Sequence, residues 1–519
     1  MTLQRRDMGA WATACAAVLL TLSLSSVHQA QSKAPAAAAP QAIEGVTLPD
    51  TPAAKQLAAW LEVFNAGDTA RLRQFLEQNR TDGASNLDGN IAIREQTGGF
   101  VIKKTIESTP TRYVALVAER DSDQFAQLTI NVDAAPPHKF GRIEIRGAPR
   151  PPEFAIQRQS ERAALDALIS NIERAAAAGR FDGAAIVAKR DKTLFSAAYG
   201  LADREKGIKN TLDTKFRIGS MNKMFTAVAV MQLVQAGKIS LTAPLGTYLT
   251  DYPNKDVASK VTIHHLLTHT GGTGDIFGPQ FNEKRAELKT IGDYVTLYGS
   301  RGLDFEPGSQ WRYSNYGFTL LGAIIEKVSG KSYYDYVRDA IFLPAGMTST
   351  GSQPEAESVA NRSIGYTKLP APMTPGQTPA EALAPRVWRP NTDSLPYRGT
   401  SAGGGYSTAG DLVRFANALL GHKLLDATHT ELVTTGKVDL PAGMGGGRYA
   451  YGFQDQAVGA TAGREASTGR WIGHSGGAPG MNGELIIYPS SGYIVAVLSN
   501  LDPPAAGRMA QFVGNRLPL

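Results

Sequence analysis

The sequence predicts an α+β protein, in which an antiparallel sheet is flanked by helices and carries an inserted helical subdomain. Two stretches, residues 183–199 and 484–498, have the apolar runs and turn residues of β-hairpins, and they lie near opposite ends of the second part of the chain. The residues between them include an apolar run over 224–234 that is typical of a buried helix. We therefore expect one sheet built from both ends of this part, with a cleft between the sheet and the helical insertion.

A smaller α+β domain is expected before it, over residues 50–148. Apolar residues at helical spacing predict two helices, one with the stripe Leu57, Trp60, Leu61 and Phe64 and one with Leu72, Phe75 and Leu76. Four strand-like runs follow, at residues 100–108, 112–119, 124–132 and 139–146. Together with the phrase Phe64-Asn65-Ala66-Gly67-Asp68, this order of elements resembles the ketosteroid-isomerase-like cone fold. Because the segment carries no acid/base set, we expect it to have an accessory role.

The ends and linkers of the 519-residue chain suggest how it is divided. Arg5 and Arg6 precede an apolar stretch, so residues 1–30 are predicted to be a secretory signal peptide, followed by an Ala/Pro-rich linker over 31–49. A second, Pro-rich linker is expected over 149–155, before the large domain at 156–519. Cleavage of the leader would place the protein in the bacterial periplasm or outside the cell, whereas an uncleaved leader would anchor it to the membrane.

Composition argues against several classes of function. The net charge is +6, but no dense basic run with interleaved aromatic residues is present, so we expect no nucleic-acid partner. The single cysteine, Cys15, lies in the leader, which excludes a disulfide or a thiolate metal site from a cleaved chain. His265 and His269 have a spacing that suits zinc, but the sequence offers no third ligand nearby, and we interpret them as hydrogen-bonded structural histidines. We therefore expect no metal and no cofactor.

Ser220 and Lys223 form the first candidate catalytic pair. Ser220 precedes the apolar run, which puts it at the N-terminus of a buried helix, and Lys223 follows one turn later on the same face. Serine is also a favoured helix N-cap, and these residues alone leave that alternative open. A partly desolvated amine held beside a hydroxyl can accept its proton and make the serine a nucleophile.

Two further motifs lie later in the chain. Tyr313 and Asn315 belong to a Tyr-Ser-Asn sequence, and His474, Gly476 and Gly477 belong to a Gly-His-Ser-Gly-Gly sequence before the second hairpin. With Ser220 and Lys223, this ordered set resembles the class C β-lactamase and penicillin-recognising serine hydrolase family. The stretches 263–272 and 403–412 extend the resemblance, which runs from about residue 182 to the C-terminus.

The resemblance implies an acyl-enzyme on Ser220, with Lys223 and Tyr313 sharing the proton transfers and Asn315 orienting Tyr313 or binding a substrate amide. The backbone amides of Ser220 and Gly477, next to Gly476, would hold the oxyanion. His474 stands where class C enzymes carry the lysine of Lys-Thr-Gly, so a fixed positive charge is missing. We therefore expect a hydrolase of esters or of small peptide and amide bonds, with a small-molecule or peptide substrate. The alternatives are a β-lactamase or D-Ala-D-Ala carboxypeptidase, and a non-catalytic penicillin-binding-like scaffold.

Overall fold

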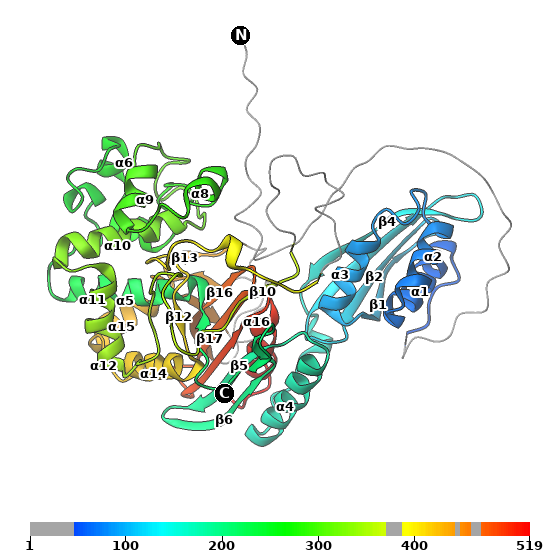
Figure 1. Cartoon of the computed structure of the whole chain (residues 1–519). Helices are drawn as coiled ribbons and strands as arrows, with labels where there is room; N and C mark the ends of the chain where they lie inside the picture. Colours follow the sequence, from blue (N-terminus) through cyan, green and yellow to red (C-terminus); the bar gives the residue numbers. More distant parts are fainter. Residues whose placement is uncertain (1–45, 370–386, 442–446, 458–468) are drawn as a thin grey trace, which may run out of the picture. The chain divides into compact units, whose positions relative to one another are not determined.

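The computed structural model describes residues 46–369, 387–441, 447–457 and 469–519 (Figure 1). The chain divides into two compact units, with the boundary between Gln157 and Arg158. The predicted leader, residues 1–30, and the linker up to residue 45 lie outside the described residues. Within the described part of the chain, no helix is long and apolar enough to cross a membrane.

The first unit contains three helices followed by an antiparallel sheet with the order β1-β2-β3-β4. Its elements are α1 (Pro52–Ala66), α2 (Thr69–Asn79), α3 (Leu87–Thr97), β1 (Phe100–Ser108), β2 (Arg112–Glu119), β3 (Phe125–Val132) and β4 (Phe140–Ala148). The side chains of Thr51 and Asp68 cap α1 and α2, and the rings of Trp60, Phe64 and Phe100 stack in the core.

The expectation of two helices in this unit was wrong, because α3 is a third. Its sequence has a weak apolar stripe and a glycine, Gly89, in its first turn, and no side chain caps its N-terminus. The helix ends at Gly98, whose φ of 71° is the left-handed conformation that favours glycine. Packing against α1 and α2, rather than local helix propensity, therefore accounts for α3. The predicted Pro-rich linker contains a 3₁₀ turn, η1 (Pro152–Phe154).

The second unit is built on one antiparallel sheet whose strands come from both ends of this part of the chain. In spatial order the strands are β13 (Val438–Asp439), β14 (Arg448–Tyr449), β15 (Gln454–Ala457), β16 (Arg470–Ala478), β17 (Met481–Ile487), β18 (Tyr493–Ser499), β5 (Gly183–Lys189) and β6 (Lys192–Tyr199). The two predicted hairpins, β5–β6 and β17–β18, join where Val495 pairs with Val187. The predicted α+β fold with one sheet from both ends is thus confirmed.

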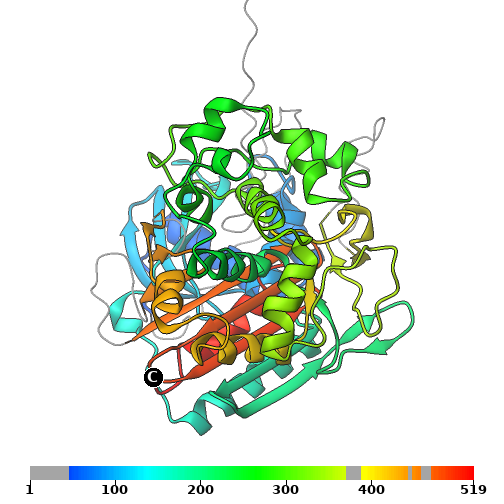
Figure 2. The ribbon, with the colours of Figure 1, turned by 90° about the vertical axis from the view of Figure 1, so that its left-hand side faces the viewer.

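Helices cover both faces of this sheet (Figures 1 and 2). Alternate strand residues, such as Val187 and Val495, pack against α4 (Glu161–Ala177) and α16 (Ala505–Gly514). The residues between them, such as Ala188 and Ile494, share a larger core with α5 (Asn222–Gln235) and α14 (Ala409–Leu420). The sheet is therefore the middle layer, and α5 lies buried against one side of it.

The remaining elements belong mainly to the segment between β6 and β13. The helices are α6 (Lys255–Lys260), α7 (Ile263–Leu267), α8 (Pro279–Lys284), α9 (Ile291–Tyr298), α10 (Asn315–Ser329), α11 (Tyr333–Val337), α12 (Leu343–Ala345) and α15 (Ala427–Thr434). The 3₁₀ turns are η2 (Gly219–Met221), η3 (Leu245–Thr247) and η5 (Thr392–Ser394), and η4 (Arg338–Phe342) is a π-helical segment between α11 and α12. The short strands are β7 (Leu201–Asp203), β8 (Ile208–Lys209), β9 (Phe216–Arg217), β10 (Tyr366–Thr367), β11 (Arg389–Pro390) and β12 (Tyr406–Ser407). Strand β9 pairs with β12 and leads directly into the turn that carries Ser220.

Candidate active site

Ser220 lies in η2, between β9 and the buried helix α5. Its neighbour Gly219 has a φ of 50°, and a Cβ added there would lie 2.9 Å from the Gly477 nitrogen. Both the left-handed backbone and the close approach therefore require glycine at this position. Helix α5 itself is preceded by Met221 and has no side-chain cap, so the alternative that Ser220 is its N-cap does not hold.

The amine of Lys223 lies at the centre of the site and is fully buried. Its Nζ is 3.3 Å from Ser220 Oγ, 2.7 Å from Asn315 Oδ1 and 2.6 Å from the carbonyl oxygen of Ala402. It also lies over the ring of Tyr313, at 4.6 Å from the centroid. The first turn of α5 thus holds the amine against groups from two other segments of the chain.

Asn315 is the first residue of α10 and connects Lys223 to Asp275. Its Nδ2 donates to Asp275 Oδ2 at 3.1 Å, and its backbone N–H donates to Asp275 Oδ1 at 3.2 Å. This donation fixes the amide so that Oδ1 faces the lysine. Burial raises the pKa of Asp275, while the nearby Lys223 charge acts in the opposite direction. The contacts of the Asn315 amide are thus with Lys223 and Asp275, an arrangement that the sequence did not suggest.

Tyr313 lies just before α10 and is positioned by an aromatic cluster. The ring of His269 contacts it in a tilted arrangement, with a centroid distance of 4.3 Å and an interplanar angle of 36°. His269 Nδ1 accepts a hydrogen bond from the backbone N–H of Ser314 at 3.1 Å. Burial lowers the pKa of His269 well below its usual value, so this imidazole is neutral. A neutral, buried His269 ring therefore packs against the Tyr313 ring.

His474 is buried in β16 and bonded to Tyr449 of β14. Its Nε2 lies 2.9 Å from the Tyr449 hydroxyl, and its Nδ1 lies 2.5 Å from the Ser475 carbonyl oxygen. The carbonyl can only accept, so Nδ1 carries the proton and Nε2 accepts from the tyrosine. Burial, with a further contribution from Lys223, lowers the pKa of His474 to about 3. The residue in place of the class C lysine is therefore neutral.

Gly476 and Gly477 form the edge of β16 that faces the Ser220 turn. A Cβ at Gly476 would lie 1.9 Å from the Ile218 carbonyl oxygen, and β16 continues past its last pair with β15, Gln454 with Gly473. From a third segment, a Cβ at Gly403 would lie 3.3 Å from the Ser220 nitrogen. Glycines therefore allow three backbone segments to meet around the serine.

Residues 168–516, more than half of the chain, match the family model described as Beta-lactamase. The chain belongs to the beta-lactamase family. Esterase EstB of Burkholderia gladioli is 31% identical over 359 residues, which cover 63% of this chain and 89% of that protein. Putative penicillin-binding protein PbpX of Bacillus subtilis (strain 168) is 31% identical over 266 residues, which cover 51% of this chain and 61% of that protein.

Solved structures agree with this family. A penicillin-binding protein from Bacillus halodurans superimposes with a TM-score of 0.56 and 31% identity, covering 67% of this chain and 98% of that chain. A D-stereospecific amidohydrolase from Streptomyces sp. gives a TM-score of 0.53 and 26% identity over 67% and 96% of the two chains. Membership of the beta-lactamase family confirms the predicted serine hydrolase class. The family match begins after the first unit, for which the cone fold and accessory role stay predictions.

In this member of the beta-lactamase family, the structure brings together most of the residues that the motifs predict and adds two that the motifs did not suggest. Ser220, Lys223, Tyr313 and Asn315 come together, whereas His474 is buried at the site's edge. Asp275 and Tyr449 were missed. Asp275 follows the Thr-Gly-Gly run of the 263–272 stretch, which is a usable signal, but nothing in the sequence around Tyr449 marks it.

The histidines spaced like zinc ligands have structural contacts. His265 Nδ1 accepts from the Thr262 backbone N–H at 3.2 Å in a capping box of α7, and His269 bonds the backbone of Ser314 as described above. The interpretation of both as hydrogen-bonded structural residues is confirmed. Over the described ranges, no group of three or more His, Cys, Asp or Glu side chains could hold a metal ion.

Proposed function

We propose that this protein is an exported serine hydrolase that forms an acyl-enzyme on Ser220 and cleaves esters or small peptide and amide bonds. The observation that carries the proposal is the placement of Lys223 Nζ, 3.3 Å from Ser220 Oγ. In the first step, the serine oxygen attacks the substrate carbonyl carbon as its proton passes to the amine. The bond from that carbon to the leaving group then breaks, and the acyl group stays on Ser220.

The hydrogen bonds of Lys223 favour its action as the base in the first step. A neutral amine has two N–H groups and one lone pair. Asn315 Oδ1 and the Ala402 carbonyl, at 2.7 Å and 2.6 Å, accept both hydrogens, which leaves the lone pair for the proton of Ser220. After the transfer, the ammonium can donate to all three oxygens. The same three neighbours therefore accommodate both protonation states.

Tyr313 is the proposed acid for the leaving group, and its phenol would later remove the proton from the attacking water. Once Lys223 has taken the serine proton, its ammonium over the Tyr313 ring favours a negative charge on the phenol, so the two residues exchange protons as one coupled unit. The oxyanion of each tetrahedral intermediate is assigned to the backbone amides of Ser220 and Gly477. The close approach of Gly219 to the Gly477 nitrogen supports this assignment.

The proposed substrate class follows from the absence of charge on His474, the histidine of the Gly-His-Ser-Gly-Gly sequence. A pKa of about 3 leaves His474 uncharged at any pH at which the enzyme would work, so it provides no cation for a substrate carboxylate. Esters and amides need no such cation, and the relatives described as an esterase and a D-stereospecific amidohydrolase have activities of this kind. Other relatives are described as penicillin-binding proteins, so β-lactams are the alternative substrates that the experiment must include.

The test compares wild-type protein with Ser220→Ala on p-nitrophenyl esters and on amides of D-alanine. We expect turnover by the wild type, a loss of at least roughly 10³-fold in Ser220→Ala, and no change in the exposed control Ser259→Ala. Mass spectrometry should find an acyl adduct on the wild type and on Ser259→Ala, but not on Ser220→Ala. Equal rates for wild type and Ser220→Ala would contradict the proposal, and rapid nitrocefin hydrolysis with a penicilloyl adduct would replace it by a β-lactamase.

Export has its own measurement. The predicted leader, residues 1–30, should be absent from protein recovered from the periplasm or medium of a bacterial host. N-terminal sequencing of that protein should start near residue 31. Recovery of the full chain in the membrane fraction would show that the leader is retained as an anchor.

A further inference from the structure

The carbonyl oxygen of Ala402 is one of the acceptors of the Lys223 amine, and it belongs to a closed loop over residues 400–405. Thr400 and Gly403 bond each other through both backbone N–H groups, with nitrogen-to-oxygen distances of 2.7 Å and 3.2 Å. Ala402 is 2% exposed, and its own N–H donates to Thr400 Oγ1 at 3.2 Å. The position of the carbonyl therefore depends on what holds this loop.

Asn222, the first residue of α5, bonds both ends of the loop. Its Nδ2 donates to the Thr400 carbonyl oxygen at 3.1 Å, and its Oδ1 accepts from the Gly405 backbone N–H at 3.2 Å. The side chain is buried. An amide supplies both the donor and the acceptor that this pair of backbone groups needs. Asn222 thus joins the start and the end of the loop whose middle carries the Ala402 carbonyl.

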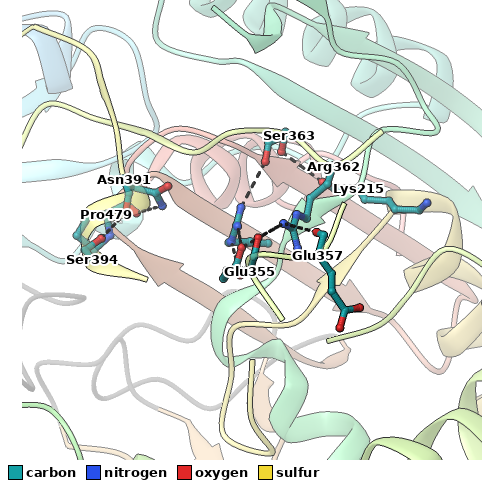
Figure 3. Close-up of polar contacts among 9 residues, drawn as sticks. Lys215, Glu355, Glu357, Arg362, Ser363, Asn391, Ser394 and Pro479 are labelled. Carbon is teal, nitrogen blue, oxygen red and sulfur yellow. Dashed lines mark hydrogen bonds and ion pairs between the residues drawn. The ribbon is translucent and has the colours of Figure 1, made fainter. Parts of the chain in front are cut away.

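The strand before Ser220 is held by other contacts. Arg217 of β9 donates to the Glu355 carboxylate and to the Ser363 carbonyl oxygen, both of which belong to the segment 355–363 (Figure 3). Strand β9 also pairs with β12. Loss of the Asn222 amide should therefore loosen the loop and leave β9 in place.

We propose that Asn222 is a positioning residue for the base of the first step. By holding the loop 400–405, it keeps the Ala402 carbonyl on one hydrogen of the neutral Lys223 amine. The lone pair of the amine then faces Ser220 Oγ, which lies 3.3 Å away. Asn222 acts through the loop, because its amide bonds the two ends of that loop. This assignment rests on the proposed acyl transfer to Ser220.

Kinetics on the p-nitrophenyl ester test the proposal. Asn222→Ala removes both hydrogen bonds to the loop, and we expect kcat/KM, which reports formation of the acyl-enzyme, to fall at least roughly 10-fold. Gly405→Ala is a second, independent variant: a Cβ there would lie 2.9 Å from both Oδ1 and Nδ2 of Asn222, so the amide must move although it is still present. It should lower kcat/KM in the same way. A wild-type kcat/KM in whichever of these two variants folds would overturn the assignment.

The pH profile separates this role from a purely structural one. A carbonyl oxygen stabilises an ammonium more than a neutral amine, so displacing the Ala402 carbonyl makes the Lys223 proton easier to lose. The acid limb of the kcat/KM profile should therefore move to lower pH in Asn222→Ala. The titratable groups around the amine are the same in both proteins: Asp275, His269, Tyr313 and His474. A lower kcat/KM with an unshifted acid limb would refute the assignment.

Asn500→Ala is the matched control. Asn500 is 2% exposed, and its Nδ2 donates to the carbonyl oxygens of Leu201 and Ile364 at 2.9 Å and 2.8 Å, outside the loop. The variant should lower the melting temperature, as Asn222→Ala does, but keep the wild-type kcat/KM. Equal losses of kcat/KM in the two variants would show that reduced stability is the cause and would overturn the assignment. Absence of Ser220-dependent turnover in the wild type would overturn the proposed function together with this assignment, whereas an active wild type with unaffected variants would overturn this assignment alone.

Discussion

At the scale of single residues, Asp275 controls which end of the Asn315 amide faces Lys223. With aspartate at 275, Asn315 must donate Nδ2 to it, so Oδ1 accepts from the lysine. Asp275→Asn allows the Asn315 amide to flip and point its NH₂ at the amine. We expect kcat to fall roughly 10²-fold with little change in KM, since the displaced amine loses its alignment with Ser220. Steady-state kinetics on the ester substrate measure this.

The matched control is Asp304→Asn, an exposed carboxylate that pairs with Arg312. It should retain wild-type kcat, because it removes the same charge without touching the site. A folded Asp275→Asn protein with wild-type kcat would show that Asn315 keeps its orientation without the carboxylate.

Glu484 of β17 gives a pH-dependent stability that is unrelated to catalysis. Burial raises its pKa from 4.5 to about 8, and the absence of a side chain at Gly507 of α16 leaves room for its carboxyl. A carboxyl whose pKa is higher in the folded than in the unfolded state binds its proton more tightly when folded. Its contribution to stability is therefore fully present below pH 4.5 and is lost as the pH rises to about 8.

Glu484→Gln should remove this dependence. Each pH unit in that window corresponds to about 1.4 kcal/mol, so the variant should be more stable than the wild type at pH 8.5 by on the order of a few kcal/mol. The two proteins should differ little at pH 4.5. Urea unfolding at both pH values measures the difference, with the exposed Glu287→Gln as control. A difference of the same size at both pH values would refute the argument.

At the scale of elements, Asn482 links the Gly476 end of β16 to the closing helix α16. Its Oδ1 accepts from the backbone N–H groups of Ala506 and Gly507, at 2.7 Å and 3.2 Å, in the first turn of the helix. Its Nδ2 donates to the Gly476 carbonyl at 3.0 Å. One buried side chain thus provides hydrogen-bond partners for two backbone N–H groups at the start of a helix and for a backbone carbonyl of the strand beside Ser220.

Asn482→Ala should therefore affect stability and activity together. It leaves three buried backbone groups without their partner, which we expect to cost about 2–4 kcal/mol of unfolding free energy. The strand edge at Gly476 also loses a support, so kcat should fall in protein that is still folded. Thermal melting and ester hydrolysis measure the two effects, and Asn282→Ala, an exposed asparagine on α8, is the control. Unchanged melting would contradict the assigned role of these hydrogen bonds.

At the scale of the whole molecule, helices and strands with a clear local pattern of apolar and turn residues were predicted from the sequence. The hairpins β5–β6 and β17–β18 and the helix after Ser220 followed from apolar runs and turn residues. Asp275 and Tyr449 did not, since Asp275 meets Asn315 across 40 residues of sequence and Tyr449 lies on a two-residue strand without periodicity. The hydrogen bond between Tyr449 and His474 likewise joins residues that are 25 positions apart. Contacts made by tertiary packing have no local pattern from which to be predicted.

Each unit of the chain has its own hydrophobic core, so we expect the second unit to fold without the first. The first core is formed by residues 53–140, and the cores around the large sheet use residues from 164 onward. Every residue of the candidate site lies in the second unit. A chain that starts at residue 156 should therefore fold, because each compact unit buries its own core. Its kcat/KM on the p-nitrophenyl ester should stay within about 3-fold of the full chain, and its far-UV circular dichroism should show cooperative melting. An insoluble or inactive fragment would mean that residues 46–155 are needed to fold or complete the hydrolase, and that their predicted accessory role is wrong.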